Sequence, residues 1–149
     1  METEEFYITL GRIAYTYSRI DFLLGYYGKA LEISNNHIEL FAKRGIKPKL
    51  DLLLKRINEI NNSFYNNTFD LLIKLQELTK IRNAIMHGLP LFSNKDIRFN
   101  KYDFDKKSNQ ILDDSHSFRV FEFIQFDIDY INLHNELFIE FERIENGAM

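Results

Sequence analysis

Apolar residues recur with heptad spacing through the first part of the chain, which predicts one long helix with a buried seam. The seam consists of Phe6, Leu10, Ile13, Tyr17, Ile20, Leu24, Tyr27 and Leu31. The stripe one position further along is mostly small, and its members are Tyr7, Gly11, Ala14, Ser18, Asp21, Gly25 and Gly28. Because glycine costs a helix interior about 1 kcal/mol relative to alanine, we expect another helix to approach closely along this stripe.

Two shorter helices are predicted after this long one. A periodic stretch covers about residues 36–44, and Gly45 is the residue type that commonly stops a helix. Pro48 suits the first turn of the next helix, and apolar residues at helical spacing continue that helix to about Ile60. The asparagine-rich run at 61–67 then predicts a loop.

Two more helices complete the predicted bundle. Thr68 is expected to cap the first of them, which ends just past His87 because Gly88 and Pro90 follow. Asp127 is expected to cap the last helix, which carries apolar residues at helical spacing towards the end of the chain.

Residues 97–104 and 110–124 contain alternating apolar and polar side chains, which is typical of strands, and turn-forming residues lie between the two segments. We therefore expect a small β-hairpin inserted before the last helix. The overall prediction is a single all-α domain over residues 1–149, an antiparallel bundle of four to five helices with this one insertion.

Composition narrows the possible functions. The chain has 149 residues, of which 45% are apolar and 28% charged, a balance that excludes a fully disordered protein. It has no cysteine, which excludes disulfides, cysteine-ligated zinc and a cysteine nucleophile. No apolar stretch reaches the roughly 18–20 residues of a membrane span, so we expect a cytoplasmic protein without a membrane partner. Motifs of phosphate-loop NTPases, dinucleotide-binding enzymes and serine hydrolases are also absent.

The formal net charge of −3 is unevenly distributed. Residues 22–112 carry fifteen basic and nine acidic side chains, whereas residues 113–149 carry two basic and nine acidic ones. The segment from Lys43 to Arg56 holds six basic residues against the single acid Asp51. A basic face of this kind can bind a polyanion such as RNA, and it can equally be the solvated surface of a helix.

The residues best suited to catalysis lie at the end of the helix that finishes near His87. Thr79, Asn83 and His87 occupy one stripe of that helix, one turn apart. Arg82 lies about 7.5 Å along the axis from His87 and roughly 140° around it, so one copy of the helix cannot easily aim both side chains at one small group. Two copies that meet at a twofold axis could do so, which favours a homodimer.

Arg82 and Asn83, followed after three residues by His87 and then by glycine, resemble the RNxxxH form of the Arg-x4–6-His motif of the HEPN family. The helical pattern is similar to that family over most of the chain, apart from the insertion at 97–124. The resemblance implies a dimeric helical bundle and a metal-independent endoribonuclease without a cofactor, in which Arg82, Asn83 and His87 are catalytic. It also implies a role in toxin–antitoxin systems or antiphage defence, with a cognate antitoxin or regulatory partner.

These residue types suit cleavage of RNA without a metal ion. The neighbouring 2′-hydroxyl attacks the phosphorus, so the enzyme need only transfer protons and stabilise the phosphorane. An imidazole is the side chain best suited to proton transfer near neutral pH, so His87 can transfer those protons. The guanidinium of Arg82 can bind two phosphate oxygens, and the products would be a 2′,3′-cyclic phosphate and a 5′-hydroxyl.

Three further residues are candidates for binding the substrate: Lys80 beside the motif, Thr79 on its stripe, and Asp21, which resembles an acidic position in the first helix of related bundles. Asp21 could equally form a structural salt bridge. Arg82 and His87 also have an ordinary alternative role, because cations near a helix C-terminus complement the helix dipole. The second hypothesis is therefore a non-catalytic module that binds a nucleotide or a protein.

Overall fold

The computed structural model describes residues 1–33, 42–43, 45–93 and 95–147. Within these ranges it contains four α-helices: α1 (Thr3–Ala30), α3 (Ile46–Ile60), α4 (Asn66–His87) and α5 (Val120–Gly147). Five strands lie between α4 and α5: β1 (Leu89–Phe92), β2 (Asp96–Asn100), β3 (Tyr102–Asp105), β4 (Gln110–Asp113) and β5 (His116–Arg119). The fold is therefore α+β, and the prediction of an all-α bundle is wrong.

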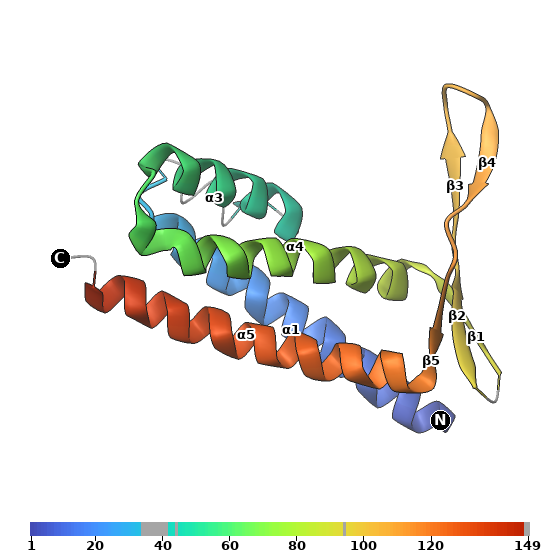
Figure 1. The fold of residues 1–149 in the computed structure, drawn as a ribbon. Helices are drawn as coiled ribbons and strands as arrows, with labels where there is room; N and C mark the ends of the chain where they lie inside the picture. The colour runs from blue at the N-terminus through green and yellow to red at the C-terminus, as the bar shows by residue number, and fades with distance from the viewer. Residues whose placement is uncertain (34–41, 44, 94, 148–149) are drawn as a thin grey trace.

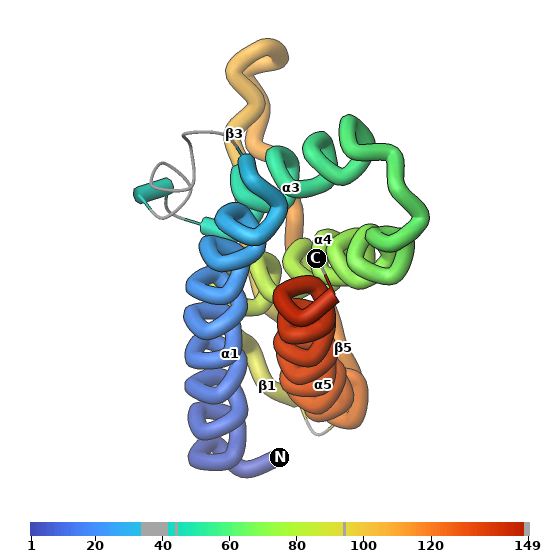
Figure 2. Tube along the Cα trace, turned by 90° about the vertical axis from the view of Figure 1, so that its left-hand side faces the viewer, coloured from blue at the N-terminus to red at the C-terminus, as the bar shows by residue number. Residues whose placement is uncertain are grey.

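The helices α1, α4 and α5 form the body of the molecule, and α3 packs on α1 and α4 (Figures 1 and 2). The strands lie at the end of the bundle where α4 ends and α5 begins. The predicted seam of α1 faces the core: its residues from Phe6 to Leu31 are buried, apart from the partly buried Leu10 and Tyr17. In the described part of the chain, no helix is both long enough and apolar enough to cross a membrane.

The stripe of small residues on α1 is buried at one end only. Gly25 and Gly28 are buried, whereas a Cβ placed on Gly11 would meet nothing within 4 Å. The expected close approach of another helix therefore does not extend along the whole stripe.

The strands form an antiparallel three-stranded sheet, in the order β1-β2-β5, and a two-stranded sheet of β3 and β4. Phe99 of β2 pairs with His116 of β5, and Tyr102 of β3 pairs with Asp113 of β4. Two residues on each strand lie between these pairs, so the same register continues from one sheet into the other. They form one long hairpin, whose base packs on the bundle through β2 and whose tip, β3–β4, projects beyond the helices (Figure 1).

The segment before the last helix thus contains more β structure than the predicted small hairpin. The last helix also begins earlier than predicted, at Val120, because Phe123 and Phe126 have the spacing of one buried helix face. Asp127 lies inside this helix rather than at its cap, and it accepts a hydrogen bond from Arg12 Nε at 2.9 Å.

Other element boundaries also differ from the sequence predictions. The helix expected at 36–44 lies mostly outside the described residues. Gly45 is the N-cap of α3, with a φ of 93° that favours glycine. The loop expected at 61–67 contains a 3₁₀ turn at Ser63–Tyr65, and α4 follows this turn directly. The predicted end of α4 at His87 is confirmed.

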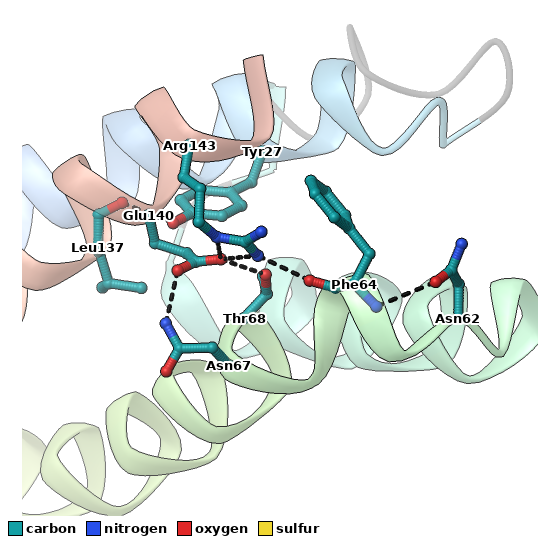
Figure 3. Close-up of polar contacts among 8 residues, drawn as sticks. All are labelled: Tyr27, Asn62, Phe64, Asn67, Thr68, Leu137, Glu140 and Arg143. Carbon is teal, nitrogen blue, oxygen red and sulfur yellow. Dashed lines mark hydrogen bonds and ion pairs between the residues drawn. The ribbon is translucent and has the colours of Figure 1, made fainter. Parts of the chain in front are cut away.

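A buried carboxylate joins the start of α4 to the end of α5 (Figure 3). Glu140 is 4% exposed and accepts hydrogen bonds from Asn67 Nδ2 at 2.5 Å and Thr68 Oγ1 at 2.9 Å. Arg143 donates to Glu140 through Nε at 2.9 Å, and through Nη2 to the Phe64 carbonyl at 2.7 Å. Thr68, expected to cap a helix, is therefore a contact between two helices.

Gly88 links α4 to β1 where β2 passes close to the helix end. A Cβ on Gly88 would lie 2.5 Å from the Cβ of Phe99 and 2.9 Å from the carbonyl oxygen of Ala84. We expect Gly88→Ala to lower the free energy of unfolding by about 1–3 kcal/mol, because the strand or the helix end must move.

Gly11→Ala is the matched control for Gly88→Ala. Its Cβ would meet nothing within 4 Å in the exposed part of α1. Alanine at Gly11 should therefore raise the free energy of unfolding by about 0.5–1 kcal/mol, because it favours the helix. Urea denaturation measures both values, and equal shifts for the two variants would contradict the close packing at Gly88.

Candidate functional site

Arg82 extends from α4 to α1, where its guanidinium lies on the ring of Tyr17. The guanidinium carbon is 3.5 Å from the ring centroid, a cation–π contact that contributes about 2 kcal/mol when it is desolvated. Nη1 of Arg82 donates a hydrogen bond to Oδ1 of Asn83 at 3.0 Å. No carboxylate in the described part of the chain forms an ion pair with Arg82. The cation is therefore held in place without being neutralised.

Tyr17 also connects this cation to α3. Its hydroxyl accepts a hydrogen bond from the backbone N–H of Ile46, the first residue of α3, at 3.2 Å. The first turn of α3 has no acidic residue, and Lys47 is exposed there. The start of a helix carries partial positive charge. The guanidinium of Arg82 and the start of α3, which both contact Tyr17, therefore both favour a nearby anion.

Asp21 lies one turn after Tyr17 on α1 and pairs with Lys49 of α3. Lys49 Nζ is 2.6 Å from Oδ1 of Asp21 and 3.1 Å from its backbone oxygen, and Lys49 is 2% exposed. Asp21 therefore neutralises a buried ammonium group, which is the structural salt bridge considered above. Within the described residues, no group of three or more histidine and acidic side chains is arranged to hold a metal ion.

Thr79 lies inside the bundle, near Tyr130 of α5. Thr79 is 7% exposed and Tyr130 is fully buried. Burial raises the pKa of the Tyr130 hydroxyl far above its ordinary value, although the charge of Arg82 opposes this shift. The Thr79 hydroxyl is buried within the protein, so it is not accessible to a ligand in this structure.

His87, the last residue of α4, is exposed. Its imidazole forms no hydrogen bond or ion pair with the part of the chain that the structure describes. Lys80 is exposed as well. The structure therefore brings Arg82 and Asn83 together, whereas His87 is exposed and forms no hydrogen bond with either of them.

Tyr17 and Lys49 were absent from the predicted site residues. Tyr17 belongs to the heptad seam of α1, so its spacing indicated only core packing. Lys49 was counted among the basic residues of 43–56, although its ammonium is buried. The sequence could have indicated that Tyr17 lies beside Asp21, since the two residues are one turn apart on the same helix.

A groove of about 510 Å³ lies between α1 and α5. Phe22, Tyr26 and Phe138 line it together with Arg19 and His134. Burial lowers the pKa of His134, and the charge of Arg19 lowers it further, so its imidazole is uncharged at neutral pH. None of the predicted site residues lines this groove.

Comparison with known proteins does not place the chain in a family. No family model, no curated protein and no solved structure matches it. The function is therefore inferred from the residues of the site and from the sequence motif.

Proposed function

We propose that the protein is a homodimeric endoribonuclease of the HEPN type, which cleaves RNA without a metal ion. The observation that carries this proposal is the arrangement of an arginine and a histidine side chain on one helix. Among the described residues, Arg82 is stacked on Tyr17 without a neutralising carboxylate, and His87 is exposed at the end of α4 without a hydrogen-bond or ion-pair partner. A fixed, unneutralised guanidinium suits phosphate binding, and an unpaired imidazole suits proton transfer.

In the proposed dimer, Arg82 of one copy and His87 of the other act on the same phosphate. Arg82 stabilises the negative charge that develops on the phosphorane, and Asn83 orients the guanidinium through its Oδ1. His87 accepts the proton of the 2′-hydroxyl or donates a proton to the leaving 5′-oxygen. The P–O5′ bond breaks as the 2′-oxygen bonds to phosphorus, which leaves a 2′,3′-cyclic phosphate and a 5′-hydroxyl.

The RNA backbone would continue from Arg82 towards exposed cations. Lys47 lies at the start of α3, and Lys80 is exposed on α4. Thr79 and Asp21 receive no direct contact with RNA in this proposal, because one is buried and the other is paired with Lys49.

An endoribonuclease of this kind damages the RNA of its own cell unless it is restrained. We therefore place the protein among growth-arresting toxins or antiphage effectors. A cognate antitoxin or regulatory protein is the partner expected to restrain it.

Incubation of the purified protein with end-labelled RNA in EDTA tests the proposal. We expect cleavage that leaves 2′,3′-cyclic phosphate ends, and we expect His87→Ala to slow it by about 10²–10⁴-fold through loss of proton transfer. His116→Ala removes another exposed histidine, on β5, and should keep the wild-type rate. Products with 5′-phosphate ends, or equal rates for the two variants, would reject the proposal.

A non-catalytic binding module is the second candidate. The stacking of Arg82 on Tyr17 favours it, because the same contact would form if Arg82 served only to pack α4 against α1. This candidate predicts that varied RNAs stay intact while a nucleotide or a protein binds tightly. Calorimetric titration with mononucleotides would detect the nucleotide-binding form of this alternative.

A further inference from the structure

One face of the long hairpin carries uncovered apolar side chains. Side chains alternate between the two faces of a sheet, and the pairing register places every second residue of β1, β2 and β3 on the same face. We name this surface the outer ribbon face and define it by Leu89, Leu91, Tyr102, Phe104 and Ile111. These side chains are exposed by 66%, 50%, 65%, 59% and 74% respectively.

Polar contacts support the continuity of the outer ribbon face. Arg98 Nε donates to Oδ1 of Asn100 at 2.7 Å, and Arg98 Nη2 lies 3.5 Å from Oδ2 of Asp113. Arg98 and Asn100 alternate along β2 with Ile97 and Phe99, which are buried against the bundle. The same face therefore runs from β1, next to the end of α4, into the projecting tip.

The tip is well formed although it projects from the bundle (Figure 1). Asp105 closes its turn by accepting hydrogen bonds from the N–H of Lys107 at 3.0 Å and from Ser108 Oγ at 2.7 Å. At its base, the N–H of Asp114 donates to the carbonyl of Lys101 at 2.8 Å. A two-stranded hairpin alone is only marginally stable in water, so a second surface is expected to cover its apolar side chains.

We infer that the outer ribbon face packs on a second copy of this chain as a twofold-symmetric dimer surface. This inference rests on the proposed function, because the composite site requires a second copy beside His87, and the face begins at Leu89, two residues further on. A twofold interface uses the same patch on both copies, so each ribbon contributes its apolar face to the contact.

The charge of the ribbon argues against RNA as the occupant of this face. Residues 102–114 contain four aspartates and two lysines, so the tip repels a polyanion. Pro90 in the edge strand β1 lacks an N–H donor, which disfavours the addition of a further strand to that edge. The exposed apolar side chains of the outer ribbon face favour packing by that face.

The size of the face also suits an interface. One buried tyrosine or phenylalanine covers about 150–250 Å², and a stable interface buries about 800 Å² on each partner. Two aromatic and three aliphatic side chains supply a large share of that area. Residues of α4 beside His87 would supply more of it in a dimer that also forms the composite site.

Ile111→Asp tests the inference, with Leu112→Asp as its matched control. Ile111 belongs to the outer ribbon face, whereas its neighbour Leu112 points to the opposite face and is 47% exposed. By size-exclusion chromatography with light scattering, we expect a wild-type dimer. We expect Ile111→Asp to raise the dimer dissociation constant at least about tenfold, because a carboxylate would be buried in an apolar contact. Leu112→Asp should leave that constant within about twofold, because its side chain stays in solvent.

A monomeric wild type, or equal effects of the two variants with unchanged circular dichroism, would overturn the inference. Weaker RNA binding by Ile111→Asp at an unchanged mass would overturn it too, because RNA would then occupy the face. The inference and the proposed function fail separately. A dimer that Ile111→Asp dissociates, without any cleavage that depends on His87, rejects only the function. Cleavage that depends on His87, in a dimer that Ile111→Asp leaves intact, rejects only the inference.

Discussion

Mixed dimers of Arg82→Ala and His87→Ala protein are expected to cleave RNA, although neither variant does so alone. In a composite site, one half of the mixed dimer lacks both groups, whereas the other half combines an intact Arg82 with an intact His87. One of the two sites in each mixed dimer is intact, so purified mixed dimers should show about half of the wild-type activity. Each variant alone should be slower than wild type by about 10²–10⁴-fold.

The control for this experiment pairs Arg82→Ala with the double variant Arg82→Ala/His87→Ala. Every site in these dimers lacks the guanidinium, so no activity should return. Co-expression with two different tags, followed by sequential purification, isolates the mixed dimers, and gel electrophoresis of labelled RNA measures the rate. Mixed dimers of the two single variants that stay inactive would show that the two side chains do not combine across the dimer axis.

Elements that depend on local spacing could be predicted from the sequence. The heptad seam of α1 repeats through its whole length, so its buried face follows from the pattern alone. The end of α4 also follows from local sequence, since Gly88 and Pro90 directly succeed His87.

The β structure could not be predicted fully, because it depends on pairing between segments. β1 has only four residues, includes Pro90 and exposes Leu89 and Leu91, so it shows no alternating burial pattern. It exists because it pairs with β2 along its whole length. The segment 120–126 contains valine, phenylalanine and isoleucine, which suit either a strand or a helix, and the packing of the bundle selects the helix.

For the candidate site, too, local features could be predicted from the sequence and contacts between helices could not. Arg82, Asn83 and His87 are recognisable from their spacing on one helix, and their divergence follows from helical geometry. The contact between Arg82 and Tyr17 depends on how α4 packs against α1, which no local pattern specifies. The burial of Lys49 likewise depends on the approach of α3 to α1.

Glu140→Ala is expected to lower the free energy of unfolding by roughly 3 kcal/mol, because hydrogen bonds to a charged group contribute about 1.5–3 kcal/mol each. The substitution removes the acceptor of Thr68, which is fully buried, and of Arg143 (Figure 3). Glu142→Ala removes the same charge from an exposed position on the same helix and should change the free energy by less than about 0.5 kcal/mol. Urea denaturation at pH 7 compares the two variants, and similar values would contradict a stabilising role of the buried carboxylate.

The pH dependence of this difference separates the charge of Glu140 from its packing. Burial alone raises the pKa of Glu140, but hydrogen bonds from Arg143, Asn67 and Thr68 outweigh burial and hold the pKa below its ordinary value of 4.5. A carboxylate whose pKa is lower in the folded protein stabilises the fold above its unfolded pKa, and this contribution is lost as the pH falls through the folded pKa. The difference in unfolding free energy between wild type and Glu140→Ala should therefore be constant above about pH 6 and shrink below about pH 4.5. A difference that stays constant down to the acid transition would assign the effect to packing, because protonation of Glu140 would then change nothing that the alanine variant lacks.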